Sequence, residues 1–578
     1  MSLSVAFTTA QNALQIIENR ISVTSNNISN ANTPGYTRET LTASYVSAAG
    51  GTTALSTDVQ GTVDAMLTKS LVASSSDAQR DSVLSSYLES YDTSMGGTNS
   101  SDTTLSSSLD NLLTAASTLS DSSSASNKDT LVTAAQQLAA QLNSLSDAVQ
   151  TERQQASNDI STSVTTINNT LDTLATLNNE IVKADPDDAA TAQLEDQRNT
   201  ALQTLSQQMG IQYYVDDDNA VHVYTDSGAI LLGSTAHHLS YTATSDIGSQ
   251  TTYPGSISGI MLDGQDITTG IGTGALGALV TLRDTTLPNE QAKLDAFSNT
   301  LSSTVNSIVN QGASVPARQT LTSDATVSAT DAFTGTGSVC IASTDANGVV
   351  QSIANIDLSG CATVGDVVNA INGAGITNVS ASIDSDGHLE ISGGGDGVSI
   401  NELDSAIGAG NEGFSDYFGL NDLFTSTNGA SDIAVSSYLT TNSDYLASGS
   451  LDATANVGDT GLTAGDTSIS AALSSALTGN ASFVAAGGFA GQTNTLSAYA
   501  GMIISSVATA ADAASNASDT STGIMTGLQT KLSDETGVDI NTETANATVL
   551  QNYYSANAQL LSVLRQMFTT LMDAYSGS

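Results

Sequence analysis

Histidine, lysine and serine would carry the chemistry of most enzyme sites, and their spacing in this sequence matches no common pattern. The four histidines, His222, His237, His238 and His388, form no H-E-x-x-H pair, which would place two zinc ligands on one helix face. No lysine follows the glycines of a phosphate-binding loop, and no G-x-S-x-G elbow marks a serine nucleophile. We therefore expect no enzyme, no cofactor and no metal site, and we interpret His237-His238 as an exposed pair at a strand end.

Two acidic clusters have the composition of a calcium loop. Asp384-Ser385-Asp386-Gly387 begins like such a loop, but its twelfth position would be Gly395, where calcium needs a bidentate Glu. We predict a hairpin turn there. Asp216-Asp217-Asp218 lies between two runs with a period of two, and it too is predicted to be a hairpin turn.

Cys340 and Cys361 are the only cysteines, too few for a disulfide framework or a structural zinc site. They flank a predicted hairpin that pairs Val339–Ala342 with Ile356–Leu358. A disulfide between them is a hypothesis, and two partly buried free thiols are the alternative.

The strongest pattern is an apolar seam at each end of the chain. The first seam has helical steps of three and four and comprises Leu3, Phe7, Ala10, Leu14, Ile17, Ile21, Thr24 and Ile28. The second comprises Leu550, Tyr554, Asn557, Leu561, Leu564, Phe568, Leu571 and Tyr575. Neither can be buried within its own segment, so we expect them to pack against each other or against copies of the chain. The alternative is two ordinary amphipathic helices on a globular core.

Composition excludes several classes of partner. Lys and Arg number 13 against 58 Asp and Glu, a formal charge of −45 that repels nucleic acid and anionic lipid. The sequence contains no apolar run of about 18 residues, so no membrane-spanning helix is predicted. The start of the sequence lacks the features of a cleaved signal peptide. The apolar content of 39% is enough for packed cores.

Between the seams the apolar period changes twice from helical to alternating. We predict a mainly α fold with β-rich insertions, in which paired terminal coiled-coil helices adjoin an elongated helical-bundle rod with outer β domains. The predicted parts are a terminal domain (1–36 plus 540–578), a rod (37–210 plus 277–320 plus 479–539), a first β insert (211–276) and a second β-rich insert (321–478). We expect one helix to open at Leu105 and to continue after the polar patch 121–127. Helical spacing returns at Phe483.

A dense run of turn formers, Asn26 to Arg38, follows the first seam. Pro34 disfavours helix at Thr33, and Gly35 permits a positive φ. This run and the stretch Gln551–Gln559 resemble the bacterial flagellar rod, hook and junction proteins, the axial family. Further stretches resemble its hook–filament junction members: Gly35-Tyr36-Thr37-Arg38, Leu194–Arg198, Gly277–Pro288 and Gly413–Phe424.

This resemblance implies a structural protein that leaves the cytoplasm by type III export and assembles outside the cell at the hook–filament junction. The implied partners are copies of the chain in a ring or helical turn, the hook protein, the second junction protein, and a cytoplasmic export chaperone on the C-terminal helix. The implied assembly interface is Leu3, Phe7, Leu14, Ile17, Ile21, Asn27, Ile28, Asn30, Pro34, Gly35, Tyr36, Tyr554, Asn557, Leu561, Leu564, Phe568 and Leu571. The alternatives are another axial protein (flagellin or hook protein) or a secreted protein whose outer insert binds or catalyses.

Single helices of this length are marginal in water. We therefore expect Met1 to about Thr33 and about Ile540 to Ser578 to be largely unfolded in the monomer.

Overall fold

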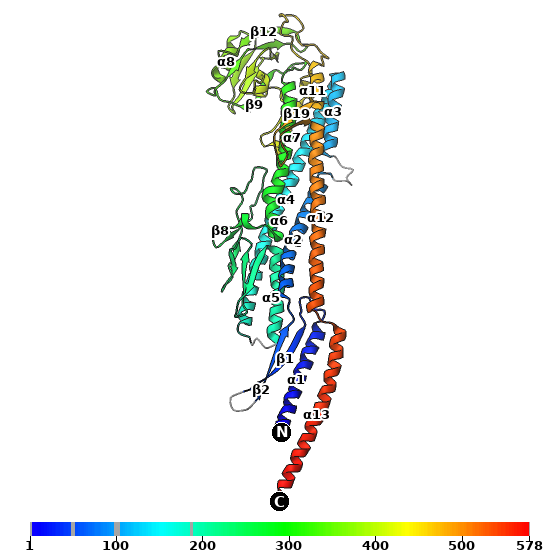
Figure 1. Cartoon of the computed structure of the whole chain (residues 1–578). Helices are drawn as coiled ribbons and strands as arrows, with labels where there is room; N and C mark the ends of the chain where they lie inside the picture. The colour runs from blue at the N-terminus through cyan, green and yellow to red at the C-terminus, as the bar shows by residue number, and fades with distance from the viewer. Residues whose placement is uncertain (1–2, 48–52, 97–103, 185–188, 577–578) are drawn as a thin grey trace.

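The computed structural model describes residues 3–47, 53–96, 104–184 and 189–576. The molecule is long and thin, with both described ends at one extremity and the second β insert at the other (Figure 1). Long helices run along its axis, and the β elements project from one side. The predicted fold class, mainly α with β-rich insertions, is confirmed.

The rod is a bundle of long helices. Its helices are α2 (Ala65–Ser94), α3 (Leu105–Asp121), α4 (Ala125–Ile181), α5 (Ala189–Gln208), α6 (Gly274–Thr281), α7 (Leu287–Val309), α11 (Ser468–Thr478) and α12 (Leu496–Thr536). A π-helical segment, Leu282–Thr286, joins α6 to α7. Leu131, Leu138, Leu142 and Leu145 form a fully buried stripe on α4, which follows from their helical spacing. None of the helices in the described part of the chain combines the length and apolar character needed to cross a bilayer.

The chain reverses direction at the polar patch 121–127, so the expected continuation of one helix is wrong. Ser124 caps α4 by accepting a hydrogen bond from the backbone N–H of Asn127. The side chain of Asn127 donates to the carbonyl of Ser122 at 2.8 Å. These hydrogen bonds favour a turn, and α3 packs back on α4 as a helical hairpin.

The predicted return of helix at Phe483 is also wrong. A hairpin of β19 (Asn480–Phe483) and β20 (Gln492–Thr495) comes first, and the helix begins at Leu496. The ring of Phe483 stacks on Tyr499 of α12 with centroids 3.9 Å apart. Phe483 thus contacts the helix from a neighbouring strand. The spacing of apolar residues alone does not distinguish such a strand residue from a residue of the helix itself.

The first β insert packs against α4 and α5. Its strands are β3 (Ile211–Val215), β4 (Val221–Thr225), β5 (Ile230–Leu232), β6 (Leu239–Ser240), β7 (Met261–Leu262) and β8 (Gln265–Asp266). Residues 216–219 form the predicted turn between β3 and β4, and Asn219 has a φ of 64°. His237 and His238 lie just before β6 and contact Asp263 and Asp172 at 2.7 and 2.9 Å.

The second β insert, here called the head, has its own core as far as Leu420, whereas Phe424, Val435 and Leu439 lie in the buried cluster of the rod. Its elements are β9 (Thr320–Thr326), β10 (Gly335–Thr336), β11 (Ser338–Thr344), β12 (Val350–Asp357), α8 (Val364–Gly373), β13 (Ser380–Ile383), β14 (His388–Ser392), β15 (Gly397–Asn401), β16 (Ala406–Ile407), α9 (Phe414–Phe418), β17 (Phe424–Thr425), β18 (Ala434–Val435) and α10 (Ser437–Thr441). The turn predicted at 384–387 is present, with Gly387 at a φ of +90°.

The two cysteines are free thiols on opposite sides of β11, so the disulfide hypothesis is wrong and its alternative is confirmed. Val339 pairs with Ile356 as predicted, and Val339 and Ile341 face the main head core. Cys340 alternates with them and packs in a separate small cluster, whereas Cys361 contacts the main core.

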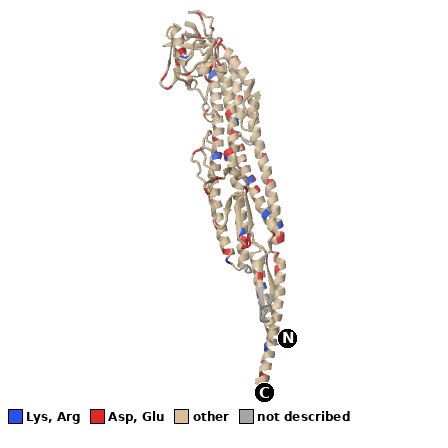
Figure 2. Cartoon of the chain, turned by 60° about the vertical axis from the view of Figure 1, so that its left-hand side comes forward, with Lys and Arg blue, Asp and Glu red and all other residues tan. Residues whose placement is uncertain are grey.

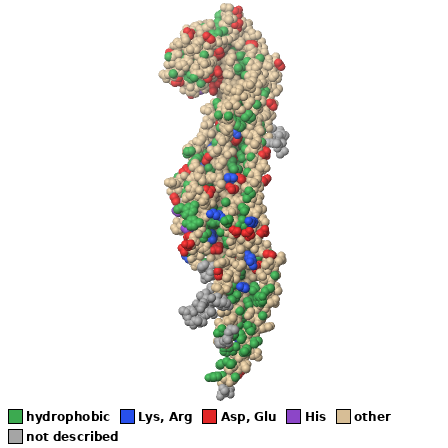
Figure 3. All heavy atoms as spheres, viewed as in Figure 1, with side chains coloured by type: hydrophobic (Ala, Val, Ile, Leu, Met, Phe, Trp, Pro, Cys, Tyr) green, Lys and Arg blue, Asp and Glu red, His purple; other side chains and the backbone are tan. Residues whose placement is uncertain are grey.

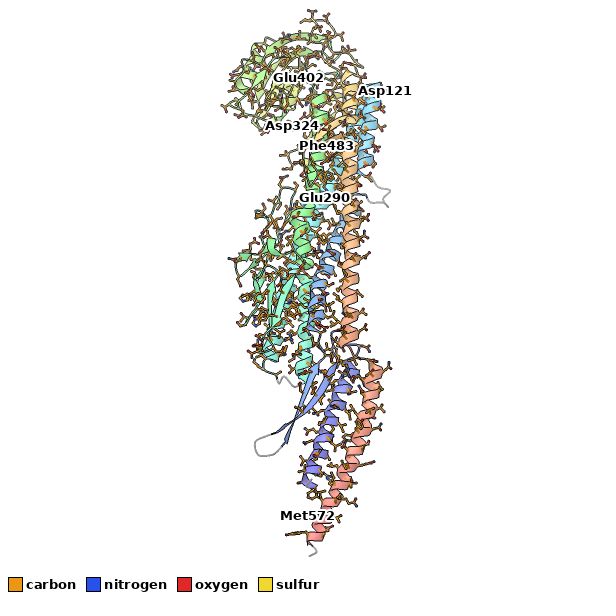
Figure 4. The ribbon with its side chains drawn as sticks, viewed as in Figure 1. Asp121, Glu290, Asp324, Glu402, Phe483 and Met572 are labelled. Atoms are coloured by element: carbon orange, nitrogen blue, oxygen red, sulfur yellow. The ribbon has the colours of Figure 1, made fainter. Side chains whose placement is uncertain are left out.

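Two asparagines at the end of α7 connect the head to the rod. The side chain of Asn306 donates to the carbonyl of Phe424 at 2.7 Å. The side chain of Asn310 donates to Asp422 at 2.6 Å and accepts the backbone N–H of Asn421 at 2.8 Å. Asp324 also lies where the head meets α7 (Figure 4).

Positive charge is unevenly distributed along the molecule. No lysine or arginine occurs between Arg318 and Lys531, a stretch that includes the whole head. The head is therefore acidic throughout, and the basic residues lie along the rod and the terminal helices (Figure 2).

Candidate functional site: the terminal helices and the corner

The terminal helices α1 (Leu3–Asn30) and α13 (Ile540–Ser576) lie side by side. The seam of α1 faces its partner, with Ala10 and Ile17 3% and 8% exposed. On α13 the seam residues Leu550 and Leu564 are buried. The ring of Phe7 meets that of Phe568 edge to face, with centroids 6.3 Å apart. The seams therefore pack against each other within one chain.

This arrangement differs from the expectation that both ends are unfolded in the monomer. That expectation treated each helix as isolated. In the structure each seam covers the other, and both helices are held at their rod-proximal ends. The two ends of the same chain thus serve as partners for each other, through contacts between residues more than 500 positions apart.

A second apolar stripe on α13 lies in solvent. The outer stripe comprises Val549, Tyr553, Leu560, Val563 and Met567, which are 46–58% exposed. Each lies one position before a seam residue, and so about 100° around the helix. Apolar side chains gather over this end of the molecule (Figure 3), and the exposed Met572 lies near its tip (Figure 4). Exposed apolar surface of this kind marks an interaction site.

The outer stripe was not predicted, because each of its residues stands next to a seam residue in the sequence and the seam alone accounts for the helical period. Of the predicted interface on α13, Tyr554 and Phe568 are 38% exposed and Leu571 is 62% exposed, while Asn557 and Leu561 are half-buried. On α1, Leu3, Phe7, Leu14, Ile21 and Ile28 are all half-buried.

The corner, residues 31–39, turns the chain from α1 into the hairpin of β1 (Glu39–Ser47) and β2 (Thr53–Gly61). Gly35 has a φ of +80°, as its type permits. A Cβ added there would lie 2.6 Å from Oγ1 of Thr200 on α5. Glycine is therefore required by backbone conformation and by space. Asn30 and Pro34 line a groove beside it, together with Leu177 and Thr200.

Asn27 is buried, and it holds the corner rather than presenting a surface. Its side-chain nitrogen donates to the carbonyl of Glu39 at 2.9 Å. Its oxygen accepts the N–H of Glu39 and the hydroxyl of Tyr36, each at 2.9 Å. Burial, together with the charges of Glu39 and Asp196, raises the pKa of Tyr36, so its hydroxyl stays a donor at neutral pH.

Asp196 of α5 joins the corner to the rod. Its two carboxylate oxygens accept the backbone N–H and the hydroxyl of Thr37, each at 2.8 Å. Burial raises the pKa of Asp196, although both hydrogen bonds from Thr37 oppose the shift. Asp196 lies within the stretch Leu194–Arg198 that carried part of the resemblance, but its partner is more than 150 residues away and cannot be read from local sequence.

Across the described ranges, no three His, Cys, Asp or Glu side chains gather as a metal-ligand set. The region offers an apolar surface on a paired helix and a hydrogen-bonded corner that fixes where the helices leave the rod.

Three segments match known protein families. Residues 93–320 match the helical domain of flagellar hook-associated protein FlgK, and residues 7–37 match the flagella basal body rod protein family. Residues 341–395 match the flagellin hook IN motif, and this segment contains the helix α8 and the hairpin of β13 and β14.

Full-length relatives agree with these matches. The chain is 25% identical to flagellar hook-associated protein 1 of Salmonella typhimurium, and equally to that of Salmonella typhi, over 98% of each chain. The structure of the flagellar hook junction protein FlgK from Burkholderia pseudomallei shares the fold, with a TM-score of 0.50 and 18% identity over 80% of this chain and 99% of that one. The helical-domain match and the full-length relatives thus make the chain similar to flagellar hook-associated protein 1 along nearly its whole length, and the fold is shared with a flagellar hook junction protein.

Proposed function

We propose that this chain is the structural adaptor that joins the hook of the bacterial flagellum to its filament. The observation that carries the proposal is the pairing of α1 with α13, which leaves the outer stripe of α13 exposed at the end of an elongated rod. The full-length similarity to hook-associated protein 1 supports the same conclusion.

Assembly would bury the outer stripe against neighbouring subunits. Burying a Leu, Val or Met side chain fully contributes roughly 1.5–3 kcal/mol. The outer stripe has four such residues per subunit and Tyr553, all about half-exposed, so burying them would supply several kcal/mol against the entropy lost on docking. Copies of the chain would occupy part of this surface, and the hook protein below and the second junction protein above would occupy the rest.

The same surface would need protection before export. A cytoplasmic chaperone that covers the C-terminal half of α13 would keep the outer stripe from premature contacts. The chain would then pass through the type III export channel and assemble outside the cell, where its acidic head would face solvent. Its role is structural, without catalysis.

Immunogold labelling of isolated flagella tests the adaptor role. A narrow band at the distal end of the hook is expected. Label along the whole filament would instead identify a flagellin, and label along the hook a hook protein. A binding or catalytic activity retained by the isolated insert 321–478 would overturn the purely structural role.

A further inference from the structure

Arg38, the last basic residue before the β1–β2 hairpin, contacts both helices that meet at the corner. Its backbone N–H donates to the carbonyl of Thr536, the last residue of α12, at 2.7 Å. Its carbonyl accepts the backbone N–H and the hydroxyl of Thr62, each at 2.9 Å. Its guanidinium approaches Glu543 of α13, with Nε and one terminal nitrogen both 2.7 Å from Oε1.

Glu543 is a buried carboxylate in the first turn of α13. It is 1% exposed, and its backbone N–H donates to the carbonyl of Asp539, which also caps the helix through its side chain. Its position at a helix N-terminus suits a negative charge. A buried carboxylate whose cation is removed is strongly destabilised, since neither water nor a partner then compensates the charge.

Only three residues, Gly537, Val538 and Asp539, connect α12 to α13. The terminal pair continues the rod end to end rather than lying along it (Figure 1). The angle between them therefore depends on contacts at the corner. Asp196 anchors the corner to α5 through Thr37, and Arg38 extends this anchor to α13.

We propose that Arg38 is a positioning residue that sets the angle of the terminal helix pair relative to the rod, and that its ion pair with Glu543 holds this angle. The consequence for assembly rests on the proposed function, because a subunit whose ends point in a variable direction cannot present the outer stripe to a ring. The positioning itself is a property of the single chain.

Double electron–electron resonance on the purified full-length chain measures this angle. Spin labels replace Thr530 on α12 and Gln559 on α13, both exposed, in a Cys340→Ala, Cys361→Ser background. The parent should give one narrow distance distribution. Arg38→Gln should broaden it at least twofold, because Glu543 is left buried without its cation. Glu543→Gln should broaden it less, since a neutral amide remains.

The double variant Arg38→Gln/Glu543→Gln separates the ion pair from general damage. Its distance distribution should be narrower than that of Arg38→Gln alone, because the double variant has no buried carboxylate left without a cation. Lys531→Gln is the matched control: Lys531 is 65% exposed near the end of α12 and only 4.0 Å from Glu535, and its loss should leave the distribution unchanged. The melting temperature of the rod should be equal in all variants.

An unchanged distribution in Arg38→Gln would overturn the proposal. So would a double variant as broad as the single one, or equal broadening in Lys531→Gln. These measurements use the isolated chain, so a failure of the adaptor role in the immunogold experiment would leave their interpretation intact.

Discussion

Gly35 combines a φ of +80° with a Cβ position 2.6 Å from Thr200, so two independent costs meet at one residue. Left-handed backbone costs a β-branched residue about 1–2 kcal/mol before any clash is counted. We expect Gly35→Val to export normally but to dock on isolated hooks at least tenfold more weakly. Gly360→Val is the control, because a Cβ there meets no atom within 4 Å. Equal docking of the two variants would show that the corner geometry is unimportant.

The two thiols should differ in reactivity. Burial raises the pKa of Cys340 to about 11, so little thiolate forms at neutral pH. Burial and the nearby carboxylates of Asp366 and Asp357 raise the pKa of Cys361 as well, but Cys361 is only half-buried. We expect iodoacetamide at pH 8 without reductant to modify Cys361 first, and Cys340 only after unfolding in urea. Intact mass spectrometry of the secreted protein checks this, and an unmodified mass two hydrogens short would reveal a disulfide.

At the scale of the element, neighbouring positions on α13 have separable roles. Leu564 is buried against α1, whereas Val563 is 53% exposed on the outer stripe. Leu564→Asp should bury a charge, separate α1 from α13 and block assembly, at a cost on the order of 3 kcal/mol. Val563→Asp should block assembly and leave the pair intact.

Hydrogen exchange of α1 in the purified chain distinguishes these two variants. Protection of residues 3–30 should be lost in Leu564→Asp and retained in Val563→Asp, while the rod melts at an unchanged temperature in both. Assembly of Val563→Asp at the wild-type level would remove the outer stripe from the interface.

The joint between head and rod should respond to pH. Burial raises the pKa of Asp422 to about 7 and that of Asp416 to about 6, and Asp324 nearby is also raised. A carboxyl with a raised folded pKa contributes stability at low pH that is lost as the pH rises through that value. The free energy of unfolding should therefore fall by roughly 2–4 kcal/mol between pH 5 and pH 8, and Asp422→Asn should remove much of this pH dependence.

Urea unfolding of the head measures this slope. Asp432→Asn serves as the control: hydrogen bonds from Ser426, Thr427 and Asn428 outweigh its burial and lower the pKa of Asp432, so its titration falls below this window. Equal slopes in Asp422→Asn and the parent would show that Asp422 does not cause the pH dependence.

The local sequence pattern predicted an element correctly where alternation or a single turn-forming residue determines the local structure. The hairpin 339–358 and the turn at 384–387 follow from alternation and from turn-forming glycine. It failed at Ser122–Ser124, where polar residues tolerated by a helix instead close a turn. It failed again at Phe483, whose contact with Tyr499 is tertiary.

At the scale of the whole molecule, the segments expected to assemble differ from those that form the buried cores. The buried clusters of the rod and the head contain no residue of α1 or α13. A chain truncated to 37–539 should therefore melt within a few degrees of the full-length protein and yet fail to dock on hooks. Differential scanning calorimetry and hook binding check this. A large fall in melting temperature would mean that the ends stabilise the rod.

The candidate site could be predicted only in part. The seams and Gly35 follow from spacing and turn chemistry. Asp196 and Glu543 do not, because each meets the corner across 159 or 505 positions of sequence and no local period encodes that distance. Asn27 was predicted as interface, and its burial shows that a turn-forming asparagine can serve the fold instead.

The absence of lysine and arginine between Arg318 and Lys531 determines how the molecule can be labelled and digested. Trypsin must release residues 319–531 as a single large fragment, which carries the entire head. Amine-reactive dyes and cross-linkers have no side chain to react with anywhere in the head, because all five lysines lie in the rod. A probe intended for the outermost part of the subunit has to be directed at its carboxylates or at Cys361.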